Sequence, residues 1–282
     1  MVREGMSSFI SKAFGIGVIT CIFILISTAR SLAGAWTMGS GELYERLAFN
    51  YYYAGAEYGA NQDHLKSFRD TDISNYIEYG ITDRITLINS LYYKFLKKED
   101  QYEDVSSNGL GDIDLGVKYK VADGSWGVLS TQGLIKIPGL YGKDDPLPLG
   151  NAQYDFELRV LYGRSLWPVI PGYCNFEIGY RWRFGDPSDE IRYLIEFGAD
   201  ITKNIYGRIK LDSILSMDNG TKSNNPANPM AYYNYDLGKL DIALGIKITK
   251  AFGIELCYTP AIYGWNTTEG ATYTVALIYI LK

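Results

Sequence analysis

Charged side chains occupy alternate positions in several segments of this sequence. At this spacing they could pair with one another or act on charged solutes. Between residues 112 and 120, Asp112, Asp114, Lys118 and Lys120 lie among apolar residues. Alternate residues of an extended strand lie on one face, so each such segment presents a row of ions. Rows of both signs either pair and nearly close the space between them, or line a narrow passage that selects solutes by charge. The candidate lumen-lining residues are Arg46, Glu78, Lys94, Asp112, Asp114, Lys118, Asp155, Glu157, Arg159, Glu177, Arg181, Arg183, Arg192, Glu196, Arg208, Asp212 and Lys247.

Other kinds of chemistry have little support in these residues. Asp112 and Asp114 could hold a hard cation through their carboxylates, but we expect them to pair with nearby Lys or Arg. The single histidine, His64, follows Asp63 and would need a partner from another loop to act as a general base. No dinucleotide-binding or P-loop pattern stands between a strand and a helix. The sequence therefore predicts no catalytic residue, no metal ligand and no cofactor, and a protein that is not an enzyme.

Short strands are the elements that must position these ions. From residue 42 onward the dominant period is two, as where Phe176, Ile178 and Trp182 alternate with Glu177 and Arg181. No helical pattern of useful length competes with it. The expected strands span residues 42–54, 71–81, 84–97, 111–122, 126–137, 151–163, 174–184, 190–201, 205–217, 233–249, 253–264 and 271–281.

Strand number, strand length and connections favour an all-β, transmembrane, antiparallel up-and-down barrel of about 12 strands. An even number and lengths of about 10 to 14 residues suit tilted strands that cross a bilayer. Even-numbered connections are mostly tight and odd-numbered ones mostly long, which is typical of periplasmic turns and outer loops and places both termini in the periplasm. The connections 164–173 and 185–189 depart from this parity. The long loops are expected at residues 55–70, 98–110, 138–150 and 218–232.

The direction of each face follows from energetics. A charged side chain on the lipid-facing side of a barrel costs roughly 2 to 4 kcal/mol at the bilayer midplane, so the ions must turn inward. The alternative is a soluble β-sandwich whose apolar faces pack together. The 25 Tyr and 5 Trp favour the barrel, because these residues are enriched at membrane interfaces.

The first 35 residues are typical of a secretory signal peptide. Arg3 and Lys12 precede an apolar stretch over 13–29, and Ala33-Gly34-Ala35 offers a cleavage site before Trp36. An uncleaved membrane anchor is the alternative, because the apolar stretch is long for a signal. We therefore expect residues 1–35 to be removed and residues 36–282 to form the barrel in the outer membrane.

Charge excludes a nucleic-acid partner. The formal net charge is −5, so the chain has no basic field for a phosphate backbone. Cys174 and Cys257 remain after export, but the alternation places them on opposite faces of distant strands. We expect no disulfide between them.

Four phrases of the sequence carry a family resemblance. The phrases are YIEYGITDRITL at 76–87, GLGDIDL at 109–115, QYDFELR at 153–159 and GYRWRF at 179–184. Together with Ala35-Trp36-Thr37, they resemble the XagA-like outer-membrane proteins and, more distantly, the channels of the meta-pathway phenol-degradation family. The resemblance implies an outer-membrane β-barrel, and it supplies no catalytic residues. Some relatives are associated with uptake of hydrophobic or aromatic compounds, and others with adhesion and exopolysaccharide operons. Lys282 departs from the usual terminal aromatic of such barrels.

These observations predict a passive outer-membrane channel or transporter for small molecules with a charge-lined lumen. The alternative is an envelope barrel that serves adhesion or exopolysaccharide export through its extracellular loops. The expected partners are outer-membrane lipid and a small-molecule solute of unknown identity. Self-association into a homo-oligomer is left open, and no nucleic acid is expected.

Overall fold

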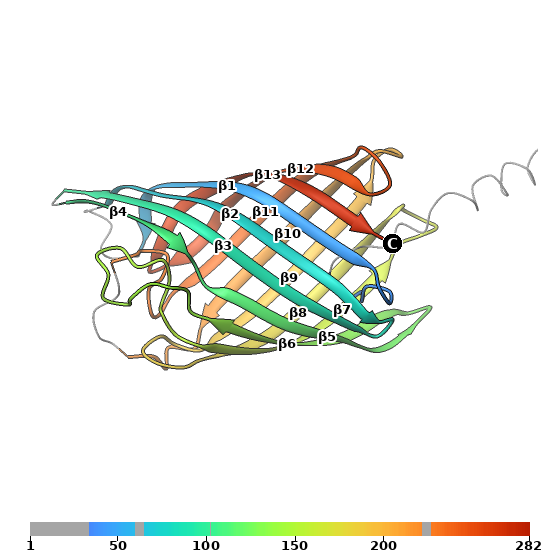
Figure 1. The fold of residues 1–282 in the computed structure, drawn as a ribbon, viewed down its shortest axis with the longest axis horizontal. Helices are drawn as coiled ribbons and strands as arrows, with labels where there is room; N and C mark the ends of the chain where they lie inside the picture. The colour runs from blue at the N-terminus through green and yellow to red at the C-terminus, as the bar shows by residue number, and fades with distance from the viewer. Residues whose placement is uncertain (1–33, 60–64, 102, 222–226) are drawn as a thin grey trace, which may run out of the picture. The chain divides into compact units, whose positions relative to one another are not determined.

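A computed structural model describes residues 34–59, 65–101, 103–221 and 227–282. In these residues the strands form one antiparallel sheet in the order β2-β1-β13-β12-β11-β10-β9-β8-β7-β6-β5-β3-β4, and β2 also pairs with β3. This additional pairing closes the sheet on itself, so the strands wrap into a barrel (Figure 1). Within the same described residues, no helix is long and apolar enough to cross a membrane. The strands are β1 Leu43–Tyr58, β2 Leu65–Thr82, β3 Ile85–Asp100, β4 Asp104–Leu110, β5 Ile113–Gly124, β6 Gly127–Ile137, β7 Asp155–Ser165, β8 Gly172–Arg183, β9 Glu190–Asp200, β10 Ile205–Ser216, β11 Asp236–Lys247, β12 Phe252–Trp265 and β13 Thr267–Leu281.

The two ends of the barrel differ in their connections. At the end we call the turn end, the links are short and span residues 83–84, 125–126, 166–171, 201–204 and 248–251. The other end, the loop end, carries the long connections 138–154 and 217–235 and the short 184–189. The first loop is shorter than the predicted 55–70, because β1 continues to Tyr58 and β2 already begins at Leu65.

Strands β4 and β5 share one place in the wall. β4 pairs with β3 from Tyr93 to Glu99, and β5 pairs with β3 from Ile85 to Ser90. The closed antiparallel barrel therefore has twelve strand positions, which confirms the predicted fold. The expected loop over 98–110 is wrong for most of its length, because pairing with β3 overrides the low strand propensity of residues 106–109.

Exposure alternates along the strands and separates two chemically different faces. On β5, Leu115, Val117 and Tyr119 are 43% to 47% exposed on the outer face, whereas Lys118 between them is only 1% exposed. The same alternation recurs around the wall, so large apolar side chains cover the outside and buried polar side chains project inside. A soluble sandwich would show the reverse arrangement, with its ions at the surface.

Candidate functional site

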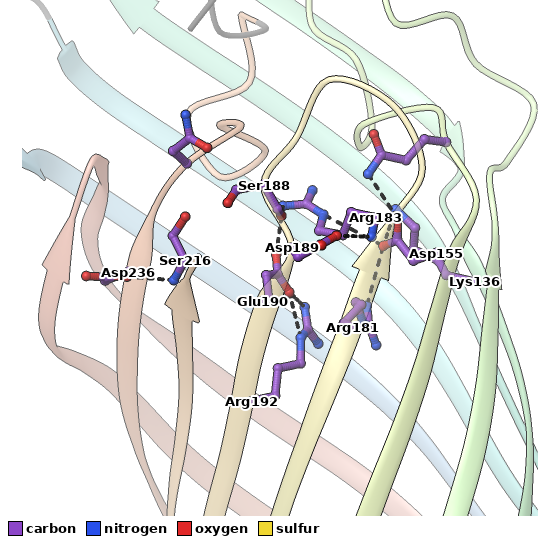
Figure 2. Close-up of polar contacts among 12 residues, drawn as sticks. Lys136, Asp155, Arg181, Arg183, Ser188, Asp189, Glu190, Arg192, Ser216 and Asp236 are labelled. Carbon is purple, nitrogen blue, oxygen red and sulfur yellow. Dashed lines mark hydrogen bonds and ion pairs between the residues drawn. The ribbon is translucent and has the colours of Figure 1, made fainter. Parts of the chain in front are cut away.

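The largest group of buried charges lies on β7, β8 and β9 toward the loop end (Figure 2). Arg181 Nε donates to Glu157 Oε2 at 2.9 Å, and Arg183 Nη1 lies 2.7 Å from Glu190 Oε1. Strand register brings these ions together, because Arg181 stands opposite Glu157 on one side and Glu190 on the other. We call this group the arginine network. Its other members are Asp112, Lys136, Asp155, Arg159, Glu177 and Arg192.

The arginine network is deeply enclosed. Glu157 is 0% exposed and Glu190 is 2% exposed, so neither carboxylate could remain charged there without a partner. Lys136 of β6 joins Asp112, which directly precedes β5, to Asp155 of β7, since its Nζ lies 3.1 Å from both Asp112 Oδ2 and Asp155 Oδ2. Acids and bases thus alternate from strand to strand along the inner surface of the wall.

A second network centres on Arg208 of β10. Its Nη1 lies 3.0 Å from Asp241 Oδ1 and 3.3 Å from Glu196 Oε2, and its Nη2 lies 3.1 Å from Glu255 Oε1. Arg46 of β1 reaches the same Glu255 oxygen at 3.2 Å. This network joins β9 to β12 and β1 from inside the barrel.

The remaining predicted residues form separate pairs or have no ionic partner. Asp114 and Asp212 make no ion pair within 4.0 Å among the described residues, and the Oδ1 of Asp114 is buried without a hydrogen bond there. Three lysines each hold one carboxylate: Lys118 Nζ lies 3.0 Å from Glu78 Oε2, Lys94 Nζ 2.5 Å from Asp70 Oδ2, and Lys247 Nζ 2.6 Å from Asp200 Oδ1.

Sequence reasoning left Lys136, Glu190 and Asp70 out of the candidate set. Lys136 and Glu190 lie within expected strands at positions that the alternation turns inward, so the same rule could have found them. Asp70 falls in the expected loop 55–70, where no alternation was assigned.

Residues 35–38 cross the barrel interior near the turn end. Ala35 is 0% exposed and packs against Val128 and Leu161. Trp36 meets the Tyr173 ring edge-on, with ring centroids 5.9 Å apart. Side chains of three different strands hold the backbone of this segment: Ala35 N donates to Asn175 Oδ1 at 3.0 Å, Lys118 Nζ donates to Trp36 O at 3.2 Å, and Met38 N donates to Thr86 Oγ1 at 2.8 Å.

A glycine in the wall makes room for this segment. A Cβ atom on Gly163 would lie 2.5 Å from the Trp36 indole, so any other residue there would displace the ring. Residues 1–33 lie outside the described residues, and the signal peptide with its cleavage before Trp36 stays a prediction. His64 also lies outside them.

An apolar group, the loop-end cluster, fills the interior at the opposite end. Leu147 and Leu149 of the 138–154 connection pack against Tyr52, Phe68 and Leu96, which project inward from β1, β2 and β3. Leu147 is only 1% exposed. The sequence predicts this connection as an outer loop, and it gives no signal that part of the loop turns into the barrel.

Hydrogen bonds fix the backbone of that loop. Ser107 Oγ of β4 donates to Leu147 O at 2.6 Å, and Asn228 Nδ2 of the 217–235 connection donates to Pro148 O at 2.8 Å. Tyr141 donates its hydroxyl proton to Asp112 of the arginine network. Burial, together with this carboxylate, holds the pKa of Tyr141 well above its ordinary value, so the hydroxyl stays a donor at neutral pH.

Asp189 joins two further loop-end connections. Its Oδ1 accepts a hydrogen bond from the Arg183 backbone at 2.8 Å (Figure 2). Its Oδ2 accepts one from Asn219 Nδ2 at 2.9 Å. Partial burial raises the Asp189 pKa, but the hydrogen bonds from Arg183, Asn219 and Tyr180 outweigh it. The net effect is a pKa below the ordinary value for aspartate.

Some interior charges remain wetted despite these contacts. The side chains of Arg46 and Arg192 are each 23% exposed, and those of Lys94 and Asp112 are each 21% exposed. Within the described part of the chain, no group of three or more His, Cys, Asp and Glu side chains could hold a metal ion. The arrangement therefore offers charged surface to a solute that enters the barrel.

Comparison with solved structures places this architecture among outer-membrane barrels. The COG4313 outer membrane channel from Pseudomonas putida F1 superimposes with a TM-score of 0.68 at 12% sequence identity, over 91% of this chain and 100% of that one. The NanC porin gives a TM-score of 0.56 at 8% identity, over 84% of this chain and 100% of that one. A KdgM porin in complex with disordered oligogalacturonate gives 0.51 at 7% identity, over 84% and 99% of the two chains.

This chain has the fold of an outer-membrane β-barrel. No protein-family model matches the sequence, and no curated protein matches it either. The structural neighbours are channels and porins, but at these identities the likeness concerns the fold alone. The resemblance to XagA-like proteins is not confirmed and stays a prediction.

Proposed function

We propose that this protein is a passive outer-membrane channel for small molecules whose lumen is lined by the arginine network and the Arg208 network. The observation that carries the proposal is that these ions pair along the inner surface of a closed wall while several stay wetted. Neighbours that are channels and porins support a transport role rather than an enzymatic one.

We further propose an orientation and a resting state. The turn end faces the periplasm, because outer-membrane barrels have short periplasmic turns and longer outer loops, and this places both termini there. In the resting state residues 36–38, which remain after cleavage before Trp36, narrow the lumen at the periplasmic end, and the loop-end cluster narrows it at the outer end. Solute passage then requires at least one of these segments to move.

Planar-bilayer recording of the purified protein tests this function. The Arg192→Gln variant removes a wetted interior cation, so its open channel should pass cations relative to anions more readily than the wild type. Lys97→Gln is the matched control, because Lys97 lies on the outer face of β3 with its side chain 47% exposed. This control should leave ion selectivity unchanged.

The opposite result would favour the alternative function. A barrel that never conducts, in wild-type form or after deletion of residues 36–38, would exclude a channel. If deletion of the 138–154 loop then abolished attachment of cells or secretion of exopolysaccharide, the protein would act through its outer loops.

A further inference from the structure

Three polar side chains lie together on the outer face of the barrel, where the alternation otherwise places apolar residues. Glu45, Asn75 and Asn89 project outward from β1, β2 and β3, which run side by side in the wall (Figure 1). Asn75 Nδ2 donates to Glu45 Oε1 at 2.7 Å. Register places Asn89 beside Ile77, which itself stands opposite Glu45. The three residues therefore form one patch, which we call the amide patch.

The amide patch is surrounded by apolar side chains. Leu47, Ile73, Leu87 and Leu115 around it are 42% to 48% exposed on the same outer face. Asn89 makes no side-chain hydrogen bond to any other described residue, whereas the Nδ2 of Asn75 donates to Glu45. The amide of Asn89 thus faces outward with both its donors and its acceptor unused by the described chain.

The amide patch lies within the apolar band rather than at its rim. Asn89 lies four residues after the start of β3 at Ile85, and Asn75 lies seven residues before the end of β2 at Thr82. With a rise of about 3.3 Å per residue and a tilt of about 40°, these positions are roughly 10 and 18 Å above the turn end. Tyr79 of β2 lies between the patch and that end and is 41% exposed on the same face.

A groove of about 580 Å³ adjoins the amide patch on the same outer face. Apolar side chains such as Leu87, Val117 and Ile135 line it, and Asn89 belongs to the same lining. The groove is open at Gly133, an outward position without a side chain, where a Cβ would meet only Leu158 Cδ2 at 3.8 Å. It is therefore a depression that a side chain or chain segment from outside could fill.

The hydrogen-bonding needs of the Asn89 amide determine which kind of molecule should cover this surface. An amide in hydrocarbon loses its hydrogen bonds to water, and an acyl chain offers it neither a donor nor an acceptor. A protein side chain can supply both, which is why polar residues often mediate association inside membranes. A lipid would fill the groove but would leave the Asn89 amide unsatisfied.

We propose that the amide patch and its groove form the contact between two copies of this chain. An amide is both donor and acceptor, so Asn89 can pair with the Asn89 of a second copy across a two-fold axis, as a self-complementary interface requires. Apolar side chains that flank the patch then enter the partner's groove at Gly133. The inference rests on the proposed membrane placement and is independent of conduction.

Disulfide cross-linking in intact outer membranes tests the contact directly. Asn89→Cys is made in a Cys174→Ser background, because Cys174 is a free thiol that is only half-buried. The matched control is Ile242→Cys on β11, an outward position that is 44% exposed on a different part of the wall. Oxidation should link Asn89→Cys chains into dimers, because residues at a two-fold axis come within disulfide range, and should leave Ile242→Cys chains monomeric.

Sedimentation equilibrium in detergent supplies a second measurement without cysteine. The wild type should be dimeric, and Asn89→Leu should weaken the dimer by about tenfold, which is typical of losing a hydrogen-bonded pair within a membrane. Gly133→Phe fills the groove and should weaken it as well. Heat-modifiable electrophoretic mobility verifies that each variant is a folded barrel, so a folding defect is recognised.

Three results would overturn the proposal. One is a wild-type protein that is monomeric and cross-links no better at Asn89→Cys than at Ile242→Cys. Another is a dimer that Asn89→Leu leaves intact. The third is a monomer that retains a bound lipid in native mass spectrometry and loses it in Gly133→Phe, which would assign the groove to an acyl chain. Recovery of the protein in the soluble fraction would instead overturn the proposed membrane function.

Discussion

Lys118 and Glu78 form a salt bridge inside the barrel, with Nζ 3.0 Å from Oε2 and both side chains only 1% exposed. The Lys118 ammonium also donates to the Trp36 carbonyl at 3.2 Å. The other oxygen of Glu78 accepts a hydrogen bond from Tyr76. A single buried cation therefore connects β2 and β5 to the segment that crosses the interior near the turn end.

Replacement of Lys118 by Met should lower the free energy of unfolding by about 3 to 5 kcal/mol, because it leaves the Glu78 carboxylate buried without its cation. Urea titration of the barrel in detergent or vesicles measures this loss. Lys120→Met is the matched control on the same face of β5, and its partner Asp123 has a side chain that is 50% exposed. Such an exposed pair is worth at most about 1 kcal/mol.

The double variant Lys118→Met/Glu78→Leu separates an unpaired charge from lost packing. We expect it to recover most of the stability, since it removes both buried charges together. Equal stability losses for Lys118→Met and Lys120→Met would contradict the importance of the buried pair.

Local alternation explains why so much of the fold could be predicted. Phe176, Ile178 and Trp182 identify a strand and its outward face from neighbouring residues alone, and the same rule applies wherever a strand has two different faces. The sequence pattern does not predict strand β4, because residues such as Ser106 and Ser107 do not alternate between apolar and polar types. Its order comes from pairing with β3, which is a nonlocal contact.

Contacts between distant segments explain what sequence could not predict. Whether Arg181 pairs with Glu157 or with another acid depends on the register between strands, which alternation does not fix. Leu147 looks like any apolar residue of an outer loop, and only the folded chain shows that it enters the barrel. Asn89 is a polar residue at an outward position, where the alternation otherwise places apolar residues. It cannot be recognised as an exception before the inner and outer faces of β3 are known.

Replacement of Trp36 by Ala should open the turn end of the lumen. The change removes the edge-on contact with Tyr173 and the packing at Gly163, so residues 36–38 should leave the interior more often. Planar-bilayer recordings should show more frequent or larger openings than the wild type. Because Trp36 is only half-buried, the cost in unfolding free energy should be below the roughly 3 kcal/mol of a fully buried Trp.

Trp126→Ala is the control for this variant. Trp126 is 45% exposed and stacks on Tyr162 of the outer face, so it should change neither the frequency nor the size of openings. Identical recordings from Trp36→Ala and wild type would mean that this segment does not limit passage.

Replacement of Leu147 by Ala should release the 138–154 loop from the loop-end cluster. Truncating a fully buried Leu costs about 2 to 5 kcal/mol, and here the loss falls on one loop rather than on the whole wall. Limited proteolysis should therefore cut this loop much faster than in the wild type while the barrel stays folded. Leu140→Ala in the same loop should have no effect, because Leu140 is 92% exposed. Slow cleavage of both variants would show that the cluster does not hold the loop.

Acid should loosen the connection between the 184–189 and 217–235 segments, because Asp189 holds them together as a carboxylate. Its pKa lies below the ordinary value in the folded protein, since hydrogen bonds from Arg183 and Asn219 outweigh partial burial. A lowered folded pKa contributes stability that is fully present above the unfolded pKa of about 3.9 and is lost as the pH falls through the folded value. Little should therefore change between pH 7 and pH 5.

Hydrogen exchange of these segments, corrected for its intrinsic pH dependence, should rise as the pH falls through the lowered pKa of Asp189 and its carboxylate becomes protonated. Asp189→Asn should exchange faster than the wild type at pH 7 and show little further rise in acid. Asp186→Asn in the same turn is the control, because among the described residues the Asp186 carboxylate has a single ionic contact, at 3.8 Å to the exposed Lys143, and its loss should leave the acid response intact. An acid response that persists in Asp189→Asn would assign it to another carboxylate of the loop end.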